Sequence, residues 1–367
     1  MSGHILLHAE SWYIFVRLLV EWHVVAMASS GLYVNPNTGQ TQAGLQPFRN
    51  AIINGDMRIN QRGTSTNLAS MTAVGATFRY VVDRWGVFRV GYATDSQMAQ
   101  GTNISASDLP FTEAGITTFA RISRIVNTTG TSFIYLNYGL ESQDSRKFAG
   151  KTITLSFYYR TGANFSASSL YSIISTGKGI DQGIQRGSGL TSQVDINNLL
   201  PINLNWSRAK YSVTITDTAV TQLGLQFAYL PTGTAGAADY VDITGVQLEL
   251  GSVATPFEVR PYPVEMELCQ RYYQVIGSGD AYGTFTGTTT ATLAYIFKVP
   301  MRVIPTPTLP SSINLDHENV GSKVSTSVGT SRSSINTYSF GAGALSGGVV
   351  GVWVGLSSGT IPLSAEL

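Results

Sequence analysis

Residues 151–162, KTITLSFYYRTG, alternate apolar and polar side chains over a run that ends at a glycine. Successive side chains of an extended strand point to opposite faces, so Ile153, Leu155 and Phe157 would share one face. This spacing indicates a β-strand with one side against a core.

Short strand-like runs recur on both sides of this one: FRYVVDRWGVFRV (78–90), TTFARISRIV (117–126), SFIYLNYGL (132–140), SLYSIIS (169–175), AKYSVTIT (209–216), QLGLQFAYL (222–230) and ADYVDITGVQLEL (238–250). Gly, Asn, Ser and Pro separate the runs, and Asn54-Gly55-Asp56 reads as a turn. Many short strands between turn signals are typical of β-sandwiches and jelly rolls. We therefore predict an all-β chain, with a jelly-roll β-sandwich over residues 50–258.

The strand pattern stops where prolines accumulate, because proline disfavours both helix interiors and central strands. Pro263 suits a first helical position, and Glu265 and Glu267 would lie in a first turn, where the helix dipole favours anions. We predict one short helix at 263–275. Its charges would serve helix capping and solubility, while the only cysteine, Cys269, would pack inward as a small apolar group.

The first 26 residues are apolar but are broken by Glu10, Arg17 and Glu21, so no apolar span of about 18 residues could cross a membrane. They form either an amphipathic helix or an upstream extension of a protein that begins at Met27. The predicted order is a doubtful extension or helix at 1–26, an attachment arm at 27–49, the jelly roll at 50–258, a proline-rich hinge with the short helix at 259–276, and a second, smaller β-sandwich domain at 277–367.

Composition narrows the classes of function. The formal net charge of the 367 residues is +1, and only 12% are charged, about half of the usual ~25% of soluble proteins. Such a chain has no broad basic face for nucleic acid, so we expect no nucleic-acid binding. Because no apolar span is long enough to cross a bilayer, we also expect no membrane insertion. With one cysteine, no disulfide can form within the chain.

The sequence holds little material for catalysis or cofactor binding. Gly177-Lys178 lacks the remaining residues of a phosphate-binding loop. A cysteine nucleophile or a serine hydrolase would need a histidine, and zinc would need a cluster of cysteines and histidines. The four histidines are scattered: His4, His8, His23 and His317.

Acidic residues give no assignable site either. Glycosidases use paired carboxylates, but pairs such as Glu141 with Asp144 or Glu249 with Glu258 arise by chance among 22 acidic residues. A structural calcium ion could take oxygen ligands from four aspartates, although no loop has a calcium-binding pattern: Asp56, Asp83, Asp239 and Asp242. We assign no catalytic, cofactor-binding or metal-binding residue and expect no enzyme activity.

Aromatic side chains are the remaining candidates for ligand contact, because exposed rings can stack on sugar rings. The candidates in the first domain are Trp85, Trp206, Tyr158, Tyr159, Tyr171 and Tyr229. Large aromatics dominate protein cores, so core packing is the favoured interpretation for most of them, Trp85 above all.

Three phrases, taken in order over residues 50–367, carry a resemblance to a known group. These are NAIINGDMRINQRG followed by DRW, VQLELGSVATPFEVRPYPVEMELCQRYY, and FKVPMRVIPTPTL with a terminal SAEL. They resemble tailed-phage and prophage virion proteins of the tail fibre or minor structural type. The NGDM opening and the YVDITGVQLEL strand are also similar to the ends of jelly-roll carbohydrate-binding modules.

The resemblance implies a function as a virion protein that attaches to host-surface polysaccharide. Because phage fibres are usually trimers, it also implies a homotrimer that contacts other virion proteins. Weak sugar contacts on several identical chains would then sum to firm adhesion. The alternative is a capsid decoration protein that stabilises the head.

Overall fold

The computed structural model describes most of the chain from residue 48 onward and four short strands before it. The described residues are 12–18, 21–27, 32–34, 41–43, 48–62, 78–89, 96–102, 104, 108, 116–184, 189–316, 321–346 and 348–367.

The amino-terminal segments contain strands. Strand β1 (Trp12–Leu18) pairs with β2 (Glu21–Met27), and β3 (Leu32–Val34) pairs with β4 (Thr41–Ala43), both antiparallel. The described residues of the 1–26 segment are therefore strands and not helix, and the predicted arm contains a strand pair.

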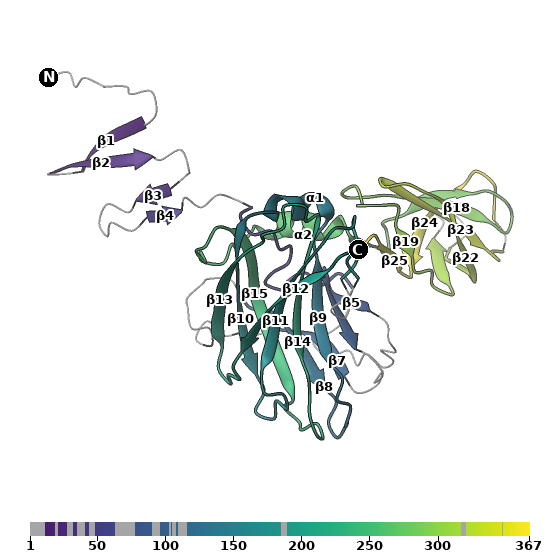
Figure 1. Cartoon of the computed structure of the whole chain (residues 1–367). Coiled ribbons are helices and arrows are strands. Elements are labelled where there is room, and N and C mark those ends of the chain that lie inside the picture. Colours follow the sequence, from purple (N-terminus) through teal and green to yellow (C-terminus); the bar gives the residue numbers. More distant parts are fainter. Residues whose placement is uncertain are drawn as a thin grey trace, which may run out of the picture.

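Two antiparallel sheets form the first domain, as predicted (Figure 1). The five-stranded sheet has the order β13 (Ser207–Thr214), β10 (Thr152–Thr161), β15 (Tyr240–Leu250), β8 (Phe119–Arg124) and β7 (Ser96–Gly101). The six-stranded sheet has the order β12 (Val194–Leu200), β11 (Leu170–Gly177), β14 (Gln222–Tyr229), β9 (Ile134–Gly139), β6 (Trp85–Arg89) and β5 (Arg79–Val82). From β9 to β15 the chain passes repeatedly between the two sheets, which makes this an all-β sandwich of the jelly-roll kind.

The core of this domain lies between the sheets. Ile153, Leu155 and Phe157 of β10 all point into it and have no exposed surface, which confirms the predicted alternation. The ring centroid of Phe227 lies 4.6 Å from that of Phe157 across the core and 6.1 Å from that of Trp85 in the same sheet. Edge and tilted contacts of this kind add to the burial of the rings.

Two glycines of the recognised phrases allow close backbone approach. A Cβ at Gly55 would lie 2.2 Å from the carbonyl oxygen of Val246, so only glycine fits the turn that starts at Asn54. In β15, Gly245 has φ +59 and lies in a bulge between the pair of Ser156 with Gln247 and the pair of Tyr158 with Thr244, and a Cβ there would meet the ring of Tyr158 at 2.8 Å. Both positions need glycine for a structural reason.

A second, smaller β domain follows, as predicted (Figure 1). Its three-stranded sheet has the order β16 (Tyr273–Ile276), β25 (Ile361–Ser364) and β19 (Thr306–Pro307). Its seven-stranded sheet has the order β21 (Lys323–Ser325), β20 (Ile313–Asp316), β24 (Trp353–Ser358), β17 (Tyr282–Phe285), β18 (Ala291–Ile296), β23 (Thr337–Gly343) and β22 (Ser327–Ser333). A separate apolar cluster between Ile276 and Ala365 forms its core.

The helix between the domains is shorter and less solvated than predicted. Helix α2 (Tyr262–Gln270) ends five residues before the predicted boundary at 275, and Tyr273–Ile276 pair with β25 instead. Cys269 is fully buried, as expected. Glu265 is also buried, where it accepts hydrogen bonds from Arg260 at 3.3 Å and from the backbone N–H of Asn54. The prediction that its charge serves solubility was wrong, because the helix packs on the 50–62 loop.

Two short helical elements, α1 (Ser142–Ser145) and the 3₁₀ turn η1 (Arg146–Phe148), precede β10 in the first domain. None of the helices in the described residues is both long and apolar enough to cross a membrane.

The carboxy-terminal residues return to the junction between the domains (Figure 1). The carboxylate of Glu366 pairs with the buried guanidinium of Arg84 and lies 2.7 Å from Nη2 of Arg62. The hydroxyl of Tyr80 donates to the carbonyl oxygen of Leu367 at 3.0 Å. The guanidinium of Arg84 also stacks on Tyr272, 3.6 Å from the ring centroid. The phrases DRW, CQRYY and SAEL therefore meet in one buried polar contact, which we call the domain junction.

Candidate functional site

The four aspartates that could have held calcium lie in separate ion pairs with arginines. Asp242 binds Arg121 at 2.6 Å and Arg160 at 2.8 Å, and Asp239 binds Arg124 at 3.1 Å. Asp83 and Asp56 lie near Arg62 and Arg58, at 3.7 and 3.3 Å. Within the described part of the chain, no three or more His, Cys, Asp or Glu residues gather in a way that could hold a metal ion.

The carboxylate pairs also have structural partners. Glu141 accepts two hydrogen bonds from Arg271, both at 2.9 Å, and one from the hydroxyl of Tyr272 at 2.5 Å. Burial alone would raise the pKa of Glu141, but the hydrogen bonds from Arg271 and Tyr272 outweigh it and lower that pKa. Such a carboxylate is a poor proton donor at neutral pH.

The second pair is held by backbone and side-chain donors. Glu249 accepts from the backbone N–H and the hydroxyl of Thr255, at 2.9 and 2.7 Å. Glu258 accepts from the backbone N–H groups of Phe48 and Asn50, at 2.5 and 2.8 Å. Both carboxylates tie loops to the sandwich.

The thiol of Cys269 has no exposed surface, and burial raises its pKa well above the usual value for cysteine. A thiol in that state is a poor nucleophile. His4, His8 and His317 lie outside the described residues, and His23 lies in β2.

Of the six candidate aromatics, five are buried: Trp85, Trp206, Tyr158, Tyr159 and Tyr229. The core interpretation was therefore right for them. Only Tyr171 is partly exposed, and it lies on the outer face of the six-stranded sheet.

That outer face carries polar and aromatic side chains in register. Tyr171 on β11 and Tyr135 on β9 both lie opposite Ala228 of the strand between them. In the next row of the face, Gln226 lies opposite Asn137. We call this surface the amide face, and its members are Phe88, Phe133, Tyr135, Asn137, Tyr171, Ser175 and Gln226.

The aromatic members of the amide face touch one another. The ring centroid of Phe133 lies 5.6 Å from that of Tyr135 and 5.4 Å from that of Tyr171. The ring of Phe88 extends the row, 6.4 Å from Tyr135. Phe133, Tyr135 and Tyr171 are partly exposed, so this row reaches the surface.

The polar floor of the amide face has an unsatisfied group. Asn137 has no exposed surface, and neither its side-chain oxygen nor its side-chain nitrogen has a hydrogen-bond partner in the described part of the chain. Burying an unpaired amide costs about 1–3 kcal/mol, so such groups call for an explanation. Ile184 packs over Gly224, and Phe78 packs over Gly86. These two apolar side chains border the polar floor on two sides.

Sequence reasoning missed this face, although a signal was present. In QLGLQFAYL and IYLNYG the core positions are Leu, Phe, Ile and Tyr, while the alternate positions include Gln222, Gln226 and Asn137. Polar side chains at outward positions of an antiparallel sheet are common, so the amides alone do not mark a site. The strand order was needed to place them side by side.

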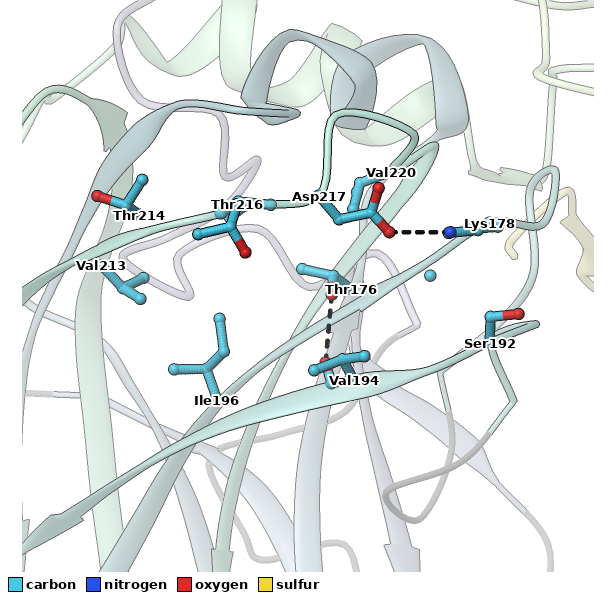
Figure 2. A pocket seen from close by; sticks show the side chains of 12 residues that line it. Thr176, Lys178, Ser192, Val194, Ile196, Val213, Thr214, Thr216, Asp217 and Val220 are labelled. Carbon is cyan, nitrogen blue, oxygen red and sulfur yellow. Dashed lines mark hydrogen bonds and ion pairs between the residues drawn. The ribbon is translucent and has the colours of Figure 1, made fainter.

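A cleft with a volume of about 290 Å³ opens where edge strand β12 faces edge strand β13 (Figure 2). Figure 2 shows hydroxyl groups of Thr176 and Thr216 beside the aliphatic side chains of Ile196 and Val213. At one end, Nζ of Lys178 lies 3.0 Å from the carboxylate of Asp217. The lining has no aromatic ring, and this lysine and aspartate neutralise each other, so we assign no ligand to the cleft.

Comparisons with known proteins leave the family open. No protein-family model matches the chain, and no curated protein matches it significantly. One solved structure with a similar fold is the enzymatically active domain of tailspike protein 4 of bacteriophage CBA120. The match has 14% sequence identity and a TM-score of 0.34, and it covers 56% of this chain and 22% of that chain. Another is TmCBM61 in complex with β-1,4-galactotriose, with 10% identity and a TM-score of 0.30 over 55% of this chain and 99% of that chain.

A third is a cyclase from Fischerella sp., with 14% identity and a TM-score of 0.35 over 56% of this chain and 96% of that chain. At such identities and TM-scores these likenesses carry no argument about ligand or activity.

Proposed function

We propose that the chain is a non-catalytic virion protein of a tailed phage that attaches to host-surface glycans through the amide face. One observation carries the glycan part of this proposal: a buried, unsatisfied amide lies in the floor of a sheet face whose rim is a row of partly exposed rings. Sugars present apolar ring faces and hydroxyl groups, which match aromatic rings and amides respectively. The resemblance of three phrases to tail proteins supports the virion part.

In the unliganded structure the floor is closed, because Asn137 and Gln226 have no exposed surface. A sugar would stack on the ring of Tyr171 first and reach Asn137 after the covering side chains move. The unsatisfied amide favours that movement, since a ligand hydroxyl would supply its missing hydrogen bond.

The first test uses two substitutions in the amide face. Tyr171→Ala is expected to weaken glycan binding by about tenfold, because it removes one stacking ring. Asn137→Leu is expected to weaken binding as well but to leave the folded state equally or more stable, because it removes an unpaired buried amide. Binding is measured by affinity electrophoresis in gels that contain surface polysaccharide from the host bacterium, and stability by urea unfolding.

The control is Tyr262→Ala, at a tyrosine of α2 that is 52% exposed and lies outside the amide face. If the wild-type protein binds polysaccharide and both amide-face variants bind as well as it does, the site is wrong. If the wild-type protein binds none, glycan attachment is wrong, and cosedimentation with capsids tests the decoration alternative.

We also propose that the protein assembles as a homotrimer, with edge strand β12 and the loop after it in the interface. Aliphatic side chains are exposed there: Val194 is 60%, Leu199 59%, Ile202 46% and Leu204 59% exposed. An edge strand with exposed apolar side chains favours association. Light scattering after gel filtration is expected to give three times the 39.4 kDa chain mass, and Leu204→Lys is expected to give monomers. A monomeric wild-type protein would contradict the proposal.

A further inference from the structure

Two exposed aromatic side chains lie together on the carboxy-terminal domain. Tyr282 of β17 is 56% exposed and Trp353 of β24 is 70% exposed. Tyr282 pairs with Gly355, two residues from Trp353 on the adjacent strand. Residues two apart on a strand point to the same face and lie about 7 Å apart. Because Ala281 and Val354 point into the core, both rings lie on the outer face of the seven-stranded sheet.

A glycine sets the position of the first ring. A Cβ at Gly355 would lie 3.2 Å from Cε1 and 3.3 Å from Cδ1 of Tyr282, so the tyrosine ring rests directly over the glycine. A ring held against the strand in this way is fixed in position and still more than half exposed. We call Tyr282 and Trp353 the aromatic platform.

Small and hydroxyl-bearing residues surround the platform. In the row of Trp353 the registers across the sheet lead to Thr284, Thr292 and Gly341. In the row of Tyr282 the registers lead to Ala294 and Ser339 on one side. On the other side they lead, across Gly355, to the exposed carboxylate of Asp316. The rings therefore stand above a low surface rich in hydroxyl groups.

We propose that the aromatic platform is a second carbohydrate subsite, which binds a neutral pyranose segment. This inference rests on the proposed function, in that it adds a site to a glycan-binding chain. Two neighbouring rings can stack on successive sugar units, while the threonine hydroxyls and Asp316 exchange hydrogen bonds with sugar hydroxyls. The carboxylate of Asp316 beside the rings would repel an acidic sugar, which fits a neutral ligand, and the hydroxyl groups beside the rings fit a sugar better than an apolar protein surface.

The platform and the amide face lie in different domains of one chain, so a long polysaccharide could bind both. Binding at the second site would then be intramolecular, which raises the overall affinity without any new contact. A short oligosaccharide would occupy one site at a time and would gain nothing from this linkage.

The test compares full-length variants in affinity electrophoresis with the same host polysaccharide. Tyr282→Ala and Trp353→Ala are each expected to weaken binding by about tenfold, and both side chains are exposed enough for the variants to fold. Tyr262→Ala is the matched control and is expected to bind like the wild-type protein. In addition, Trp353→Phe is expected to abolish most of the change in tryptophan fluorescence that the polysaccharide causes.

The outcomes separate this inference from the proposed function. If Tyr171→Ala weakens binding and both platform variants bind like the wild-type protein, the platform is wrong and the amide face stands. If only the platform variants lose binding, the platform stands and the amide face is wrong. If the platform variants lose binding because they no longer form the wild-type oligomer in light scattering, the face is a contact between copies and the inference is overturned.

Discussion

Replacing Glu366 with Gln is expected to lower the free energy of unfolding by about 3–5 kcal/mol, because removing one member of a buried ion pair leaves the other charge uncompensated. The side chains of Arg84 and Glu366 are 1% and 4% exposed. Arg84 and Arg62 approach different oxygens of this carboxylate, and an amide can accept at only one of these positions. Arginine keeps its charge in proteins, so Arg84 cannot adapt by losing a proton.

Urea unfolding at pH 7, followed by circular dichroism, measures this change. Asp217→Asn is the control, because it makes the same change from carboxylate to amide in an exposed ion pair. The side chains of Lys178 and Asp217 in that pair are 46% and 45% exposed. Exposed pairs contribute little, and we expect no measurable effect from the control. A loss below about 1 kcal/mol for Glu366→Gln would show that the domain junction behaves like a surface ion pair.

The strands inside each sheet of the first domain could be predicted from the sequence, and so could two of the four edge strands, β5 and β13, whereas the other two edge strands were missed. The alternation in β10 is clear because one face meets the core and both neighbouring strands pair with it. Strands β7 and β12, which were not predicted, are edge strands in their sheets. In β12 the half-buried positions are Ile196, Asn198 and Leu200, and the exposed ones include Leu199, so burial alternates but apolar and polar side chains do not follow it.

Buried charges were the main source of error, because local pattern does not reveal long-range partners. Glu265 has the position in α2 that suits a solvated helix start, yet its partners include Asn54, 211 residues away. Glu366 likewise pairs with Arg84, 282 residues away. The phrases that carry the resemblance were recognised as text, and the structure gives a physical reason for them: their polar residues meet at the domain junction.

The candidate site could be predicted only in part. Tyr171 was among the six aromatics considered, and core packing was correctly favoured for the other five. Asn137 and Gln226 become a site only when β9 and β14 are known to be neighbours. Tyr282 and Trp353 lie 71 positions apart and meet through the pairing of β17 with β24. Strand order, which one sequence does not reveal, decides such pairs.

The folded protein is expected to be less stable at pH 8 than at pH 5, and Asp83 is expected to cause a large part of the difference. Burial raises the pKa of Asp83 to about 7, although Arg62 and a hydrogen bond from Gln61 act against it. In the unfolded chain the pKa is near 3.8. Between these values the folded state holds a proton that the unfolded state has lost, so stability falls as the pH rises from about 4 to about 7.

The size of this effect follows from the difference in pKa. Each pH unit between the two values corresponds to about 1.4 kcal/mol, so the loss is on the order of 4 kcal/mol over the whole range between them and about 3 kcal/mol from pH 5 to pH 8. Asp56, whose pKa burial raises to about 6, adds a loss of the same sign that is complete at a lower pH.

Asp83→Asn isolates the contribution of Asp83, because asparagine cannot ionise and every other group stays. The difference in unfolding free energy between variant and wild type is expected to rise in favour of the variant from pH 5 to pH 8. Comparing this difference at several pH values cancels any fixed cost of the amide, such as a poorer hydrogen bond with Gln61. Asp217→Asn should show no trend over the same range. The Asp217 side chain is exposed, and hydrogen bonds from Ala219 and Lys178 hold its pKa below the usual value, so its carboxylate stays ionised from pH 5 to pH 8. A constant difference for Asp83→Asn would mean that the Asp83 carboxyl is already ionised at pH 5 in the folded protein and that Arg62 outweighs burial at this position.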